Sequence, residues 1–179
     1  MTTRARKVLA NCEYALADFL ASAGTPYVQS RWVSVITQLR TVLDALTKVD
    51  GPAATPEVRQ RIAAARKKLF ESKPEPRIFH EFIEDERNDT VHEYDLCAMA
   101  NPKIHGAWTL QGEPIYASHR PGVVTTAAFS MSDGPYKGRD PRQLAREAIA
   151  FWRSYLDAID SGSGTNENRL PPPSSPAAS

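Results

Sequence analysis

The stretch TPYVQSRWVSVITQLRTVLDALTKVDGP, residues 25–52, carries the strongest helical periodicity in the chain. Its apolar side chains recur every three or four residues, at Trp32, Val35, Ile36, Leu39, Val42, Leu43, Leu46 and Val49. This spacing places them on one face of an α-helix, a face that other elements must cover. Pro26 suits a first helical turn, and Gly51-Pro52 is typical of a helix end. We therefore expect a central core helix around which the fold is built.

Four further segments carry the same periodicity or the end signals of helices. They comprise residues 4–23, a segment from Thr55 to Leu69, residues 78–97, and a last segment from Asp140 to Ile159. Residues 104–132 lose this period and mix β-branched residues with Gly and Pro, which is typical of short strands. The expected strands cover residues 108–110, 114–116 and 122–131. The sequence thus predicts a mainly α fold, a bundle of about five helices with a small antiparallel β insert before the last helix.

The composition is that of a soluble globular domain. Hydrophobic side chains make up 41% of the 179 residues, and 22 basic residues nearly balance 21 acidic ones, so global charge indicates neither a nucleic-acid nor a membrane partner. Two cysteines without metal-binding spacing predict reduced thiols in a cytoplasmic protein, and no cofactor is expected. Residues 1–160 are predicted to form a single helical domain, and the Pro- and Ser-rich residues 161–179 a disordered tail.

The third and fourth predicted helices have opposite charge. The third carries a basic face of Arg59, Arg61, Arg66, Lys67 and Lys68, and the fourth is rich in Glu and Asp. A basic face could hold RNA, because Lys and Arg neutralise phosphates. We expect instead that the two helices pack as an antiparallel hairpin whose charges meet, since such pairing is common between helices.

The most unusual segment is FHEFIEDERNDTVHEYD, residues 79–95. On a regular helix, Glu86 falls within an apolar stripe and Arg87 lies at the edge of that stripe. A buried carboxylate is costly unless it is paired, so we expect Glu86 and Arg87 in an internal hydrogen-bonded network that includes Tyr94. This network could tie helices together, or it could supply an acid and a phosphate clamp in a cleft.

Within this segment, Arg87-Asn88-Asp89-Thr90-Val91-His92 has the form R-N-x-x-x-H. It resembles the signature of HEPN domains, helical bundles found in bacterial toxins and RNA-cutting defence proteins. The resemblance implies that Arg87 holds a scissile phosphate, that His92 acts as general acid or base on the ribose, and that Asn88 orients them. It also implies cleavage without metal in a homodimer cleft. On a regular helix, Arg87 and His92 point about 140° apart, so one helix alone cannot bring them together.

A metal site is the competing interpretation of the same segment. Asp85, Asp89 and His92 share a helix face, and His80 lies one turn before Glu84. The D-x-x-H spacing matches half of a di-iron site in helical bundles, but the chain offers no second copy. We therefore expect a solvated acidic surface and no bound metal.

Three functions remain open at this stage. The first is a non-enzymatic cytoplasmic interaction module that resembles HEPN domains, with a homodimer, a protein or an RNA as partner and no membrane. The second is a metal-independent endoribonuclease that acts through Arg87 and His92. The third is a metal-dependent hydrolase on the face of Asp85, Asp89 and His92.

Overall fold

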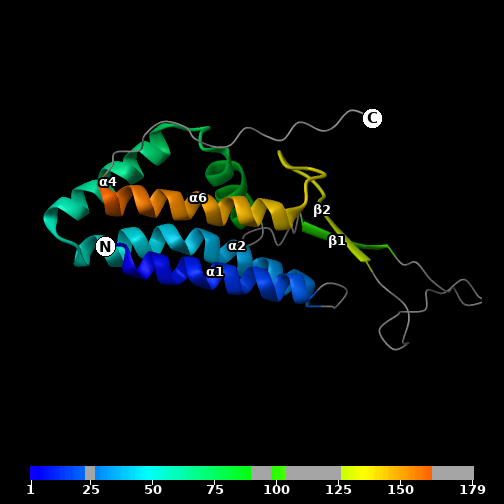
Figure 1. Cartoon of the computed structure of the whole chain (residues 1–179). Helices are drawn as coiled ribbons and strands as arrows, with labels where there is room; N and C mark the ends of the chain where they lie inside the picture. The colour runs from blue at the N-terminus through cyan, green and yellow to red at the C-terminus, as the bar shows by residue number, and fades with distance from the viewer. Residues whose placement is uncertain (23–26, 90–97, 104–125, 163–179) are drawn as a thin grey trace, which may run out of the picture.

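The computed structural model describes residues 1–22, 27–89, 98–103 and 126–162, and its fold is mainly α, as predicted (Figure 1). The helices are α1 (Thr3–Ala21), α2 (Val28–Ala45), α3 (Gly51–Ala53), α4 (Pro56–Glu71), α5 (Asp85–Asn88) and α6 (Pro141–Ser161). Two π-helical segments, η1 (Leu46–Asp50) and η2 (Ile78–Glu84), interrupt this series, and the strands are β1 (Ala98–Lys103) and β2 (Thr126–Met131). Within these ranges, no helix combines the length and the apolar character needed to cross a membrane.

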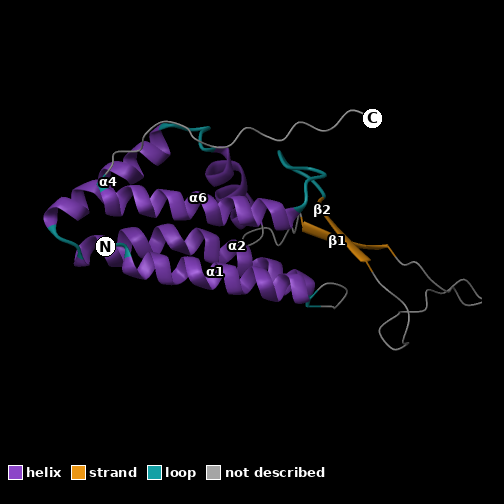
Figure 2. Ribbon diagram, in the orientation of Figure 1, coloured by secondary structure: helices purple, strands orange, loops and turns teal. Residues whose placement is uncertain are grey.

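Helices α1, α2 and α6 lie side by side and form the body of the bundle, with α1 antiparallel to both of the others (Figures 1 and 2). The predicted stripe of α2 is buried between them: Trp32, Val35, Ile36 and Leu39 are all fully withdrawn from solvent. Helix α4 leaves one end of the bundle, and η2 and α5 return to pack on α2 and α6. The central position of α2 follows from the breadth of its apolar face.

The stripe of α2 ends earlier than the sequence predicts, because the helix turns into the π-helical segment η1. Val49, which a regular helix would bury, is 47% exposed, whereas Asp50 is only 8% exposed. A π-helical turn bonds residue i to residue i+5, so each residue advances by a smaller angle than in an α-helix. The buried Asp50 carboxylate accepts hydrogen bonds from the backbone N–H groups of Arg4 and Ala5, at 2.9 and 2.8 Å. It therefore caps the start of α1 from another helix.

A second carboxylate ties the start of α1 to the end of α6. Asp160 accepts hydrogen bonds from the backbone N–H and the hydroxyl of Thr2, at 3.0 and 2.8 Å. The guanidinium of Arg6 donates to both Asp160 and Asp157. The start of α1 and the end of α6 are thus joined, at one end of the bundle, by charge-assisted hydrogen bonds.

Strands β1 and β2 form a two-stranded antiparallel sheet in which Ala98 pairs with Met131 and Lys103 with Thr126. Strand β2 lies within the expected strand 122–131. Strand β1 begins six residues before the expected β insert, directly after the segment that the sequence predicts as helix. The other two expected strands and residues 163–179 of the expected tail lie outside the described residues. The ring of Phe129 packs at 5.0 Å from that of Phe19, which fixes the sheet on α1.

The fourth predicted helix differs from the regular rod expected over residues 78–97. Residues Ile78–Glu84 are π-helical, α-helix follows over Asp85–Asn88, and residues 90–97 lie outside the described part of the chain. The π-helical turn changes the phase of the inward face, so His80 is buried beside Phe79 although a regular wheel places it off the apolar stripe.

Candidate functional site

Glu86 points inward, as the sequence predicts, and its partner is an indole. It is 5% exposed, and its Oε1 atom accepts a hydrogen bond of 2.9 Å from Nε1–H of Trp32 in α2. Trp32 is itself fully buried. The bond joins α5 to the central helix across a sequence separation of 54 residues. The predicted partner Tyr94 lies outside the described residues.

The structure brings Arg87 and Asn88 together. Arg87 is half-buried, and its Nη1 atom donates a hydrogen bond of 3.1 Å to Oδ1 of the exposed Asn88. His92, the other member of the R-N-x-x-x-H motif, lies outside the described residues. The described residues therefore include Arg87 and Asn88 of the motif but not His92.

His80 is a buried polar residue whose structural role the sequence does not indicate. It is 1% exposed, with Nε2 at 2.9 Å from the carbonyl oxygen of Leu69 and Nδ1 at 3.3 Å from Oε2 of Glu84. The ring thereby links the last turn of α4 to η2. The spacing of His80 and Glu84 is that of a fragment of a metal site. In the structure, however, Nε2 of His80 contacts the backbone carbonyl of Leu69 at the end of α4. In the described part of the chain, no three His, Cys, Asp or Glu residues gather to hold a metal ion.

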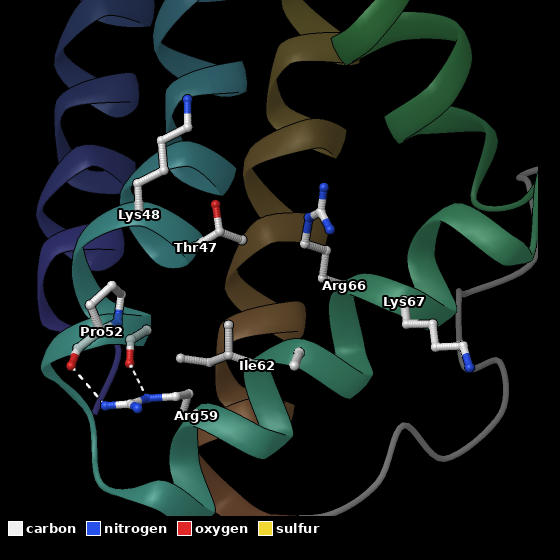
Figure 3. A pocket seen from close by; sticks show the side chains of 9 residues that line it. Thr47, Lys48, Pro52, Arg59, Ile62, Arg66 and Lys67 are labelled. Carbon is white, nitrogen blue, oxygen red and sulfur yellow. Dashed lines mark hydrogen bonds between the residues drawn. The ribbon is translucent and has the colours of Figure 1, made fainter.

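A groove between the η1–α3 corner and α4 has a volume of about 700 Å³ (Figure 3). It is lined by Thr47, Lys48, Gly51, Pro52, Arg59, Ile62, Ala63, Arg66 and Lys67. Four of these nine residues are cationic, and none of the described lining residues is acidic. We call this feature the basic groove.

The floor and the rim of the basic groove differ in chemistry. Ile62 and Thr47 lie across from each other at the floor, whereas Lys48, Arg66 and Lys67 extend away from it (Figure 3). Ile62 is 4% exposed, and its neighbour Ala63 is exposed to the groove. The groove therefore offers an apolar base with positive charge around it.

One cation of the basic groove is held in place by backbone carbonyls. Nε of Arg59 donates to the carbonyl oxygen of Gly51 at 3.2 Å, and Nη2 donates to that of Pro52 at 3.0 Å (Figure 3). Neither bond neutralises the guanidinium charge, because a carbonyl is a dipole without net charge. The α3–α4 corner thus supplies a fixed positive charge to one end of the groove.

The other cations are tethered weakly along their own helices. Lys48 lies 3.2 Å from Asp44, Lys67 lies 3.7 Å from Glu71, and the guanidinium of Arg66 sits over the ring of Phe70. Exposed pairs at this spacing contribute less than about 1 kcal/mol, so a competing anion can displace them. Arg66 also lies near the phenol of the buried Tyr155, whose pKa burial raises above its usual range.

Between described residues, the ion pairs of the basic and acidic helices run along each helix. Lys67 pairs with Glu71 in α4, Arg77, directly before η2, pairs with Glu81, and His80 lies beside Glu84 in η2. These charges are matched along each helix, at i and i+4. Of the basic face of α4, Arg59, Arg66 and Lys67 line the basic groove, whereas Nη1 of Arg61 donates to the carbonyl oxygen of Asp160 in α6 at 3.4 Å.

A second depression continues along α4. Its volume is about 430 Å³, and it is lined by Ala64, Lys67, Lys68, Glu71 and Ser72. Lys67 lines both depressions. Together they form an elongated basic surface along one helix.

Comparisons with models of protein families, with curated proteins and with solved structures give no significant match to this chain. The fold itself defines the class that can be stated: a mainly α helical-bundle protein with a two-stranded sheet at one end of the bundle.

Proposed function

We propose that this protein is a non-enzymatic cytoplasmic interaction module that binds an anionic partner in the basic groove. The observation that carries the proposal is the lining of the groove, in which four cations surround an apolar floor and no described lining residue is acidic. Positive charges gathered around one concavity attract an anion, and a carboxylate of the partner can replace the weak ion pairs that Lys48 and Lys67 make along their own helices. An opposite charge held by the partner is the simplest complement to such a site.

The rigidity of the groove supports the same proposal. Arg59 is oriented by two carbonyl oxygens before any partner arrives, and Ile62 is fixed by burial in the core. A preorganised site loses less side-chain entropy on binding than a flexible one. On binding, Lys48 would give up its weak ion pair with Asp44, and Lys67 its weak ion pair with Glu71, and each would form a new pair with the partner.

The test uses fluorescein-labelled polyglutamate and fluorescence anisotropy. The double variant Lys48→Glu/Lys67→Glu should weaken binding at least about tenfold at low salt, because each reversal places a like charge against the ligand. The matched control is Lys7→Glu/Lys137→Glu, which alters net charge equally at two exposed positions outside the groove and should bind as wild type does. Equal losses in both double variants, or no binding by wild type, would contradict the proposal.

The R-N-x-x-x-H motif supports a second candidate, a metal-independent endoribonuclease related to HEPN domains. The observation in its favour is the Arg87–Asn88 hydrogen bond directly after the buried Glu86. An Arg oriented by a neighbouring amide is suited to hold a phosphate. This candidate predicts RNA cleavage in excess EDTA that leaves cyclic-phosphate ends and that His92→Ala abolishes without unfolding the protein. Intact RNA under these conditions would exclude it.

A further inference from the structure

We infer that the occupant of the basic groove is an acidic segment of another protein that also carries apolar side chains. This inference rests on the proposed function and narrows it to a partner class. It follows from three features of the groove: the division between floor and rim, the side chains that form the lining, and the extent of the surface along α4.

The apolar floor and the cationic rim are matched best by a ligand that carries both apolar and anionic groups. A polyanion without apolar groups would satisfy Lys48, Arg66 and Lys67 but leave the floor at Ile62 and Ala63 uncovered. Burying apolar surface is the main favourable contribution to most protein associations. A ligand that places an apolar side chain on the floor and carboxylates at the rim therefore uses the whole groove.

The lining favours a peptide over a nucleic acid. Single-stranded nucleic acids are held by aromatic side chains that stack on the bases, together with a positive surface that follows the phosphates. The described lining of the groove contains aliphatic and cationic side chains and no aromatic ring. A segment that carries both carboxylates and aliphatic side chains matches this lining better.

The extent of the surface favours a chain over a compact small molecule. The basic groove and the second depression share Lys67 and follow α4 from Arg59 to Ser72. An amphipathic peptide segment binds a groove by placing its apolar face on the apolar groups of the groove. An elongated groove that also carries charged groups along its edge therefore suits such a segment. The exposed cations at its edge would set orientation, and apolar contact with the exposed Ala63 and Pro52 would supply affinity.

The experiment compares three labelled probes of equal charge: a peptide with Leu and Glu at helical spacing, polyglutamate, and single-stranded RNA. We expect wild-type protein to bind the Leu/Glu peptide about tenfold more tightly than polyglutamate, which corresponds to burial of about one Leu side chain. The variant Ala63→Gln places a polar amide on the floor and should remove this advantage while it leaves polyglutamate binding unchanged. The matched control, Ala10→Gln on the exposed surface of α1, should keep the advantage.

The other outcomes distinguish a failure of the inference from a failure of the proposed function. Equal binding of the Leu/Glu peptide and polyglutamate, both lost in Lys48→Glu/Lys67→Glu, would overturn the inference and leave the proposed function standing. Tighter binding of RNA than of the Leu/Glu peptide would also overturn the inference. Binding of all probes that survives the double charge reversal would overturn both. A free protein that sediments as a dimer, and as a monomer after the charge reversal, would make a second copy of this chain the occupant and overturn the inference.

Discussion

Glu86 in α5 and Trp32 in α2 are joined by a hydrogen bond of 2.9 Å inside the bundle, and both side chains are withdrawn from solvent. The bond connects the helix that carries Arg87 and Asn88 to the central helix of the bundle. It provides a partner for a carboxylate that would otherwise be costly to bury. Glu86 therefore positions α5, the helix that also carries Arg87 and Asn88.

Replacing Glu86 should destabilise the fold by an amount that depends on whether the new side chain can still accept the hydrogen bond of the Trp32 indole. Glu86→Ala removes the acceptor and leaves a gap, so we expect the free energy of unfolding to fall by about 2–4 kcal/mol. Glu86→Gln retains a side-chain oxygen for Trp32 and should cost less than half as much. Urea unfolding followed by tryptophan fluorescence measures both. A loss for Glu86→Ala smaller than about 0.5 kcal/mol, the range of surface changes, would show that the bond does not hold α5.

Asp50 caps α1 from the π-helical segment η1, so its removal should act at a distance in sequence. We expect Asp50→Ala to lower the free energy of unfolding by about 1–2 kcal/mol, the usual range for a lost helix cap. Asp18→Ala, on the exposed surface of α1, is the matched control and should change stability by no more than about 0.5 kcal/mol. If both variants unfold at the same urea concentration, the cap contributes nothing.

The periodicity of α2 predicts its core face, because seven of its eight apolar positions are buried where a 3.6-residue period places them. The eighth, Val49, is exposed because η1 turns Asp50 inward to reach the N-terminus of α1, a contact between segments 45 residues apart. A local pattern contains no information about such a contact. The same reason explains why the burial of His80 in η2 could not be predicted.

The candidate sites divide in the same way. The inward direction of Glu86 follows from its place in an apolar stripe, but its partner Trp32 lies on another helix and only folding identifies it. The basic face of α4 can be predicted from the sequence, whereas the groove that this face lines cannot. The groove exists because the η1–α3 corner brings Thr47, Lys48 and Pro52 beside that face.

The carboxylate of Asp160 makes part of the stability depend on pH. Burial works to raise its pKa, but hydrogen bonds from Thr2 and Arg6 outweigh burial and hold the pKa below its usual range. The unfolded chain therefore binds a proton more readily than the folded one, so stability falls as pH drops through that range. Wild type should exceed Asp160→Asn in stability at neutral pH, and the difference should shrink below about pH 4. A difference that stays constant down to pH 2.5 or so would contradict this role.

Cys12 should be chemically inert in the folded protein. Burial in the core raises the pKa of this thiol to about 12, so almost none of it is thiolate at neutral pH. In a Cys97→Ser background, the remaining thiol should react with an aromatic disulfide reagent at least about 100-fold faster in denaturant than in buffer. Comparable rates in the two solvents would show that Cys12 is accessible.

The most direct test of the account maps where an anionic ligand binds on the unaltered protein. Polyglutamate is titrated into the ¹⁵N-labelled chain, and amide chemical shifts are followed by NMR. The account predicts that the shifts cluster on residues 47–52 and 59–67, which line the basic groove. Shifts that cluster instead on residues 79–89, or that spread evenly over the surface, would contradict it.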